Sequence, residues 1–128
     1  MSERHPNLVN AHELAWIDLA DPGGRKFGTR AKPLAFPAGA ARLGCTLYEL
    51  PPGKRSCPFH YHLANEEAIY ILDGEATLRL GDREISVRAG DYIAFPVGPD
   101  HPHQLINRSG AAVHYLCMST LQTPEVAV

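Results

Sequence analysis

The most informative part of the chain reads Cys57-Pro58-Phe59-His60-Tyr61-His62-Leu63-Ala64-Asn65-Glu66-Glu67. His60 and His62 are separated by one residue, and on an extended strand residues i and i+2 point to the same face. Both imidazoles can therefore be directed at one point, where a divalent ion held at roughly 2.0–2.2 Å by nitrogen and carboxylate oxygen would fit. An intervening turn at residues 63–65 must then bring Glu66 or Glu67 in from the next strand. The pattern predicts metal ligands from two neighbouring segments.

The chain after residue 42 has the period-two hydrophobic pattern of short strands joined by tight turns. We predict strands over residues 42–50, 59–62, 67–72, 75–80, 84–89, 92–95, 103–106 and 112–118. Asp73-Gly74 is expected to form a hairpin turn, and Gly81-Asp82-Arg83 is expected to join a second antiparallel hairpin. Strands and turns at this spacing predict an all-β sandwich or jelly-roll barrel.

Length and composition limit the class of protein. The 128 residues suffice for one domain, which we divide into an N-terminal arm (1–42), a barrel (43–120) and a C-terminal tail (121–128). The net charge of -2 gives no basic surface for nucleic acid or an anionic membrane. No signal peptide or membrane span is expected. The three cysteines show no pairing pattern, which indicates reduced thiols in a cytoplasmic protein.

A second histidine cluster lies in residues 96–107, where Pro96 and Gly98 mark a loop and His101 and His103 follow it. A barrel mouth lined by His60, His62, Glu67 and His103 would offer three imidazoles and one carboxylate to a metal. The remaining octahedral positions would be open to water or substrate. Mixed nitrogen and oxygen ligands without thiolate suit Mn, Fe, Ni, Co or Zn and do not choose among them.

These two clusters resemble the two motifs of the cupin superfamily, a group of small jelly-roll barrels. The first motif runs Gly, five residues, His-x-His, three or four residues, Glu, six residues, Gly. Here six residues separate Gly53 from His60, one more than usual, and the match is then close as far as Gly74. The distance to Gly74 selects Glu67 over Glu66 as the ligand.

The second cupin motif runs Gly, five residues, Pro-x-Gly, two residues, His, three residues, Asn. Its first part is matched by Gly90, Pro96 and Gly98. His101 keeps the distance from Gly98, whereas His103 keeps the distance to Asn107. We favour His103, because the register of a strand is harder to shift than the length of a loop. The resemblance covers about residues 43–118.

The resemblance implies a single cupin barrel with a metal held by His60, His62, Glu67 and His103. Cupins with this ligand set are similar to dioxygenases, decarboxylases and isomerases, so we expect a metal-dependent enzyme acting on a small carboxylate, keto or sugar-like substrate. No wall residue stands out as a catalytic acid or base, and the catalytic residues are unknown. The alternatives are a non-catalytic module that binds or senses a small molecule, and a degenerate site without metal.

The resemblance also implies a homodimer, with a small-molecule ligand as the other partner. Four further residues are candidates for the pocket lining, although the sequence does not settle which way they point: Tyr48, Tyr92, Phe95 and Gln104.

Overall fold

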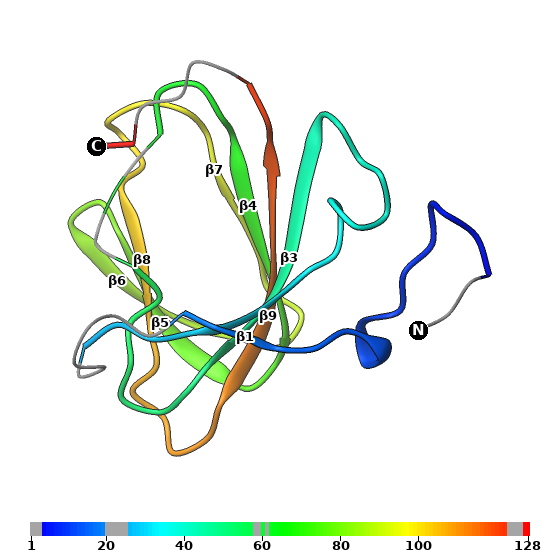
Figure 1. Ribbon diagram of the computed structural model, residues 1–128. Helices are drawn as coiled ribbons and strands as arrows, with labels where there is room; N and C mark the ends of the chain where they lie inside the picture. The colour runs from blue at the N-terminus through cyan, green and yellow to red at the C-terminus, as the bar shows by residue number, and fades with distance from the viewer. Residues whose placement is uncertain (1–3, 20–25, 58–59, 61, 123–126) are drawn as a thin grey trace.

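A computed structural model describes residues 4–19, 26–57, 60, 62–122 and 127–128, and it forms a β-barrel (Figure 1). The strands form two antiparallel sheets that face each other. The larger sheet contains, in spatial order, β1 (Ile17–Asp18), β2 (Arg30–Pro33), β3 (Leu43–Leu50), β9 (Val113–Thr120), β4 (Glu67–Asp73) and β7 (Tyr92–Phe95). The smaller sheet contains β6 (Arg83–Arg88), β5 (Glu75–Leu80) and β8 (His103–Ile106). This arrangement confirms the predicted jelly-roll fold.

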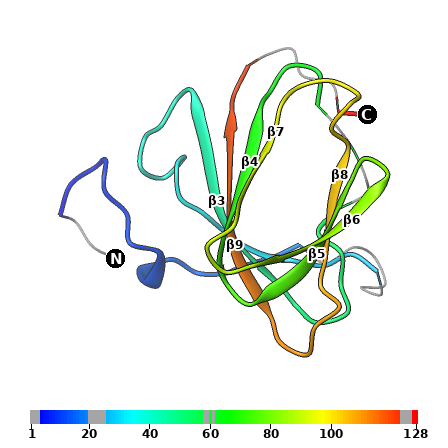
Figure 2. The same ribbon diagram turned by 180° about the vertical axis from the view of Figure 1, so that it is seen from behind.

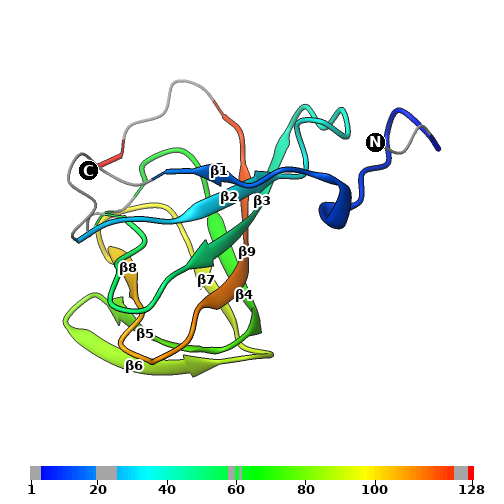
Figure 3. The ribbon, with the colours of Figure 1, turned by 60° about the horizontal axis from the view of Figure 1, so that its bottom comes forward.

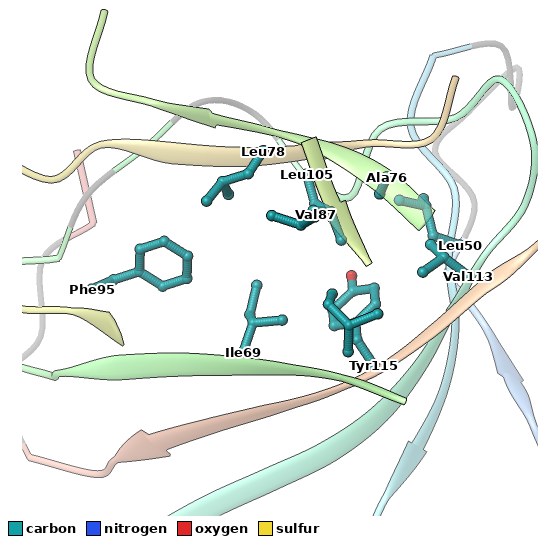
Figure 4. Packing of buried hydrophobic residues seen from close by; sticks show 10 residues of the cluster. Leu50, Ile69, Ala76, Leu78, Val87, Phe95, Leu105, Val113 and Tyr115 are labelled. Carbon is teal, nitrogen blue, oxygen red and sulfur yellow. The ribbon is translucent and has the colours of Figure 1, made fainter. Parts of the chain in front are cut away.

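The hydrophobic core lies between the two sheets, because alternate residues of each strand point into the barrel. The larger sheet contributes Leu50, Ile71 and Val113, which have no exposed surface. Leu78 and Leu105 of the smaller sheet are 1% exposed. Figure 4 shows side chains of the two sheets pointing toward one another across the interior. The view from behind shows β4 and β7 on one side of this interior and β8 on the other (Figure 2).

Most predicted strands are present, and one predicted turn is wrong. The hairpin of β5 and β6 is confirmed, with Leu80 paired to Arg83 across a two-residue loop. Asp73-Gly74 does not form a hairpin, because β4 pairs with β7 and β9 whereas β5 pairs with β6 and β8. Gly74 is instead the point where the chain passes from one sheet to the other. Its φ is 86°, and a Cβ there would lie 3.0 Å from the Cα of Val113.

The chain before β3 contributes strands to the larger sheet (Figure 3). Within the predicted N-terminal arm, β1 is a short strand that pairs with β2. The described residues contain a single helix, the 3-10 turn Ala11–Glu13. The segment before β1 extends away from the barrel in Figures 1 and 3. The division of the chain into arm, barrel and tail stays a prediction.

Candidate metal centre

The structure brings the four predicted ligand residues together on the inner wall of the barrel. His60, His62, Glu67 and His103 each present one ligand atom, and these atoms all lie within 4.8 Å of one another. The Nε2 atoms of His103 and His62 lie 3.0 and 3.1 Å from Oε1 of Glu67. The Nε2 atom of His60 lies 3.1 Å from that of His62. Glu67 enters from the first position of β4, after a bend at residues 63–64 within the turn that the sequence required.

Backbone hydrogen bonds place the first histidine cluster against β8. The amide of His60 donates to the carbonyl of His103 (3.2 Å), and the amide of His103 donates to the carbonyl of His60 (2.8 Å). The carbonyl of His62 accepts from the amide of Gly98 (2.8 Å). His60 and His62 thus form isolated antiparallel bridges, with His103 and Ala127 respectively. Part of the strand expected at 59–62, including Tyr61, lies outside the described residues.

Of His101 and His103, the structure places the side chain of His103 in the converging group. The Nδ1 atom of His103 lies 3.0 Å from the carbonyl oxygen of His101, so Nδ1 must carry the hydrogen and donate it. The ring of His103 also stacks on Phe95, with centroids 3.7 Å apart. The side chain of His101 is absent from the group of converging donors, and its backbone orients the neighbouring ligand.

The protonation pattern of these contacts favours a cation at the centre. Because Nδ1 of His103 donates to the carbonyl of His101, Nε2 is the ring nitrogen that faces the carboxylate of Glu67. Burial would raise the pKa of Glu67, but the hydrogen bond from His103 and the charges of the nearby histidines outweigh it, so the pKa is lowered. The carboxylate is therefore ionised, and lone pairs at 3.0 Å repel unless a proton or a metal ion lies between them.

The distances between donors also fit a divalent ion. Adjacent ligands of an octahedral ion with bonds of about 2.1 Å lie about 3.0 Å apart, whereas tetrahedral ligands lie about 3.4 Å apart. The three close contacts of the cluster measure 3.0 to 3.1 Å. The cluster can therefore hold a metal with two positions left open. The role of the four residues as ligands stays a prediction.

A cavity of about 290 Å³ opens beside the cluster and includes the four residues in its lining. Of the four candidate lining residues, Tyr48 lines the cavity. Phe95 lies behind the ring of His103, and the side-chain nitrogen of Gln104 donates to the carbonyl of Cys57 (2.7 Å). Tyr92 is 63% exposed and does not face the cavity.

Sequence reasoning did not identify several other cavity residues. Tyr115 and Cys117 line the cavity from β9, and the period-two alternation of that strand carried the signal, since both share the parity of buried Val113. Cys57 also lines the cavity. Its sulfur lies 3.4 Å from Nδ1 of His60, where it can accept the hydrogen that leaves Nε2 free.

Comparison with solved structures places the barrel among known folds. A sugar phosphate isomerase from a cupin superfamily of Silicibacter pomeroyi is 27% identical, with a TM-score of 0.85 over 94% of this chain and 79% of that chain. The polyketide cyclase RemF of Streptomyces resistomycificus is 28% identical, with a TM-score of 0.77 over all of this chain and 86% of that chain. A predicted oxalate decarboxylase of Thermotoga maritima, 22% identical with a TM-score of 0.78 over 90% of this chain and 99% of that chain, shares the fold.

The described residues contain no helix that is long and apolar enough to cross a membrane. Among curated proteins, an uncharacterized protein of Methanocaldococcus jannaschii, MJ1618, is 33% identical over 70 residues. The match spans 55% of this chain and 54%, about half, of that relative. Residues 46–119, more than half of the chain, match the family whose description is cupin domain, and the chain therefore belongs to the cupin family.

Proposed function

We propose that this cupin binds one divalent transition metal, Mn, Fe, Ni, Co or Zn, through His60, His62, Glu67 and His103. The observation that carries the proposal is the convergence of three imidazole nitrogens on one carboxylate oxygen within a 4.8 Å group. In this arrangement the protein offers nitrogen and oxygen ligands without a thiolate, as the proposed ions prefer. The hydrogen bond from His103 to the His101 carbonyl fixes the ring in the tautomer that a metal needs.

We further propose that the protein is a metal-dependent enzyme acting on a small carboxylate, keto or sugar-like substrate. When bound, the metal would supply Lewis acidity and open coordination positions. The proposed ligands line a cavity of the barrel, so a substrate that fills the cavity would displace water from the metal site. Two structures with similar barrels belong to a sugar phosphate isomerase and a polyketide cyclase, which supports the enzyme hypothesis.

A second candidate, a non-catalytic binding or sensing module, is supported by the chemistry of the wall. Burial raises the pKa values of Tyr48, Tyr115 and Cys117, so all three are protonated at neutral pH. Such groups are poor general bases. Among the described residues of the cavity that are not proposed ligands, none carries a carboxylate or an imidazole that could act as a general base.

The decisive experiment begins with protein purified without a chelator and without a metal-binding tag. Elemental analysis should find about one transition metal per chain, before or after reconstitution. The loaded protein is then tested for dioxygen consumption and for turnover of a panel of carboxylates, keto compounds and sugars. Turnover supports the enzyme, and tight ligand binding without turnover supports the module. Absence of metal after reconstitution would overturn both the enzyme and the binding module, and would support a degenerate site without metal.

We also propose a homodimer, whose contact would use the outer face of the larger sheet. Large apolar side chains remain exposed there: Leu43, Tyr70, Leu72 and Tyr92. Large apolar side chains exposed on one face of a sheet are typical of an interface between chains. Light scattering should give a mass of about two chains, and a monomeric mass would refute the proposal. The three free cysteines support a reducing, cytoplasmic location.

A further inference from the structure

The cavity beside the proposed metal has a wall with little capacity for charge. Its described lining includes Glu67 and three histidines, but no lysine or arginine. Arg55 precedes the lining residue Ser56, but its guanidinium donates to the side-chain oxygen of Gln104 (3.1 Å) and does not line the cavity. A phosphate or second carboxylate that reached past the metal would therefore be buried without a cationic partner among these residues, which is unfavourable.

The shape of the wall favours a flat ligand. The rings of Tyr48 and Tyr115 are stacked, with centroids 5.4 Å apart and planes inclined by 23°. Ile69 and Leu105 also line the cavity, so much of the wall away from the metal is apolar. At about 290 Å³ the space is roughly twice the ~150 Å³ of an apolar cavity that binds benzene. A one-ring or two-ring compound matches this size.

One polar group in the wall points to a ligand. Tyr115 is 3% exposed, and Figure 4 shows its hydroxyl oxygen directed into the barrel interior. This hydroxyl makes no hydrogen bond to the described residues and is not closed off from the cavity, so it can donate to a molecule bound there. In the same view, Ile69 lies between Tyr115 and Phe95, the residue that stacks on His103. The hydroxyl and the proposed metal are therefore separated along the cavity.

We propose that the cavity binds a small planar phenol or enol with two adjacent oxygens at the metal and, at its other end, an acceptor for the hydroxyl of Tyr115. This substrate class rests on the proposed metal site and goes beyond the carboxylate, keto and sugar-like compounds of the proposed function. Two adjacent oxygens match two open coordination positions, and the stacked tyrosines match a flat body. Burial raises the pKa of Tyr115 well above its usual value, so the hydroxyl is a donor at neutral pH. A phosphorylated sugar has neither the flat body nor a counterpart for its phosphate.

The test uses the full chain loaded with Zn²⁺ and three probes measured by calorimetry. The probes are catechol, 3,4-dihydroxyacetophenone, which adds a carbonyl acceptor opposite the two oxygens, and glucose 6-phosphate. We expect the acetophenone to bind most tightly and glucose 6-phosphate to bind at least about tenfold more weakly than catechol. Tyr115→Phe should weaken the acetophenone about tenfold, the size of one hydrogen bond, and leave catechol within about twofold. Tyr70→Phe, on the outer face of the larger sheet, should change neither affinity.

The outcomes separate this inference from the proposal beneath it. A chain that binds no Zn²⁺ would overturn the metal site, and this inference with it. A loaded chain that prefers glucose 6-phosphate to catechol would overturn the substrate class alone. If Tyr115→Phe weakened the binding of catechol and of 3,4-dihydroxyacetophenone equally, the proposed role of the hydroxyl would be contradicted. The preference among probes is measured on the unmodified chain, so it decides the question even if the variant fails to fold.

Discussion

Two clusters of histidine and carboxylate occupy opposite faces of the larger sheet. The inner cluster surrounds Glu67 with three imidazoles. The side chains of His103, His62 and Glu67 are 6–18% exposed. The outer cluster instead has more carboxylates than imidazoles, because His114 lies between two carboxylates. Its Nδ1 lies 2.6 Å from Oδ1 of Asp73, and its Nε2 lies 3.0 Å from Oε2 of Glu49.

The ratio of imidazoles to carboxylates decides which cation each cluster suits. In the outer cluster one proton is enough, because a protonated ring donates to both carboxylates. Burial would lower the pKa of His114, but the hydrogen bonds and charges of Asp73 and Glu49 outweigh it and raise the pKa. In the inner cluster nitrogen faces nitrogen at 3.1 Å, and one shared proton cannot satisfy every pair. A metal ion with several coordination positions can contact all of these atoms at once.

The largest expected effect is the loss of metal in His60→Ala. Removal of one of four ligands should weaken metal binding more than about 100-fold, since loss of an outer partner of a ligand alone costs about 10–100-fold. A metal present at about 100 times its dissociation constant stabilises the fold by about 2.7 kcal/mol, and the variant should lose this increment. Metal titration and thermal unfolding with and without metal measure both effects.

His114→Ala is the matched control, because it removes an imidazole from the outer face of the same sheet. It should keep the full metal stoichiometry and the full metal-dependent rise in melting temperature. If His60→Ala retains as much metal as His114→Ala, the two clusters do not differ as we argue.

A second pair of variants exchanges one carboxylate of each cluster for its amide. Glu67→Gln keeps the shape of the side chain but removes the charge, so metal affinity should fall by at least about tenfold. The metal-free variant should be less stable than the parent, because the hydrogen bond from His103 and the charges of the nearby histidines stabilise the ionised carboxylate and lower its pKa. Glu49→Gln should leave metal affinity unchanged and cost less than about 1 kcal/mol, as exposed ion pairs do. Calorimetry and urea unfolding distinguish these results; a metal-free Glu67→Gln variant as stable as the parent would count against these contacts.

The parts of the structure that the sequence predicted well depend on local spacing. The bounds of β5, β7 and β8 agree with the predicted strands, because alternation of side chains is a property of each strand alone. The convergence of His60 and His62 followed from their i, i+2 spacing. The choice of His103 followed from the register of β8, and the structure places its ring among the donors.

The parts that the sequence did not predict depend on contacts between distant segments. Asp73-Gly74 signals a tight turn, but it cannot show that β4 pairs with β9 and not with β5. Asn107 matched a motif without an assigned role. It has no exposed surface, and its amide donates to the carbonyls of Leu50 and Ala111, both at 2.8 Å. The partner that gives Asn107 its role in the fold lies on β3.

The two clusters should also respond to pH in opposite directions. His114 has a raised pKa in the folded chain. Its contribution to the free energy of unfolding is therefore complete below the unfolded pKa of about 6.5, and it is lost as pH rises through the folded pKa. For Glu49, burial would raise the pKa, but the bonds from His114 and Arg30 outweigh it and lower the pKa. Its contribution is present above about pH 4.3 and is lost as pH falls. The inner histidines must be neutral to bind a metal, so metal affinity should fall below about pH 6.5.

The smallest expected effect is therefore the pH-dependent loss of stability in His114→Gln, measured by urea unfolding in the presence of a chelator. Both outer charges are present between about pH 4.3 and 6.5, so the variant should lose most near pH 5.5, about 0.5–1 kcal/mol after allowance for solvent screening. Near pH 8 the ring is less protonated, and the loss should shrink. A loss that is equal at both pH values, or larger near pH 8, would mean that His114 is held as a neutral ring. The outer cluster would then lack the charge that distinguishes it from the inner one.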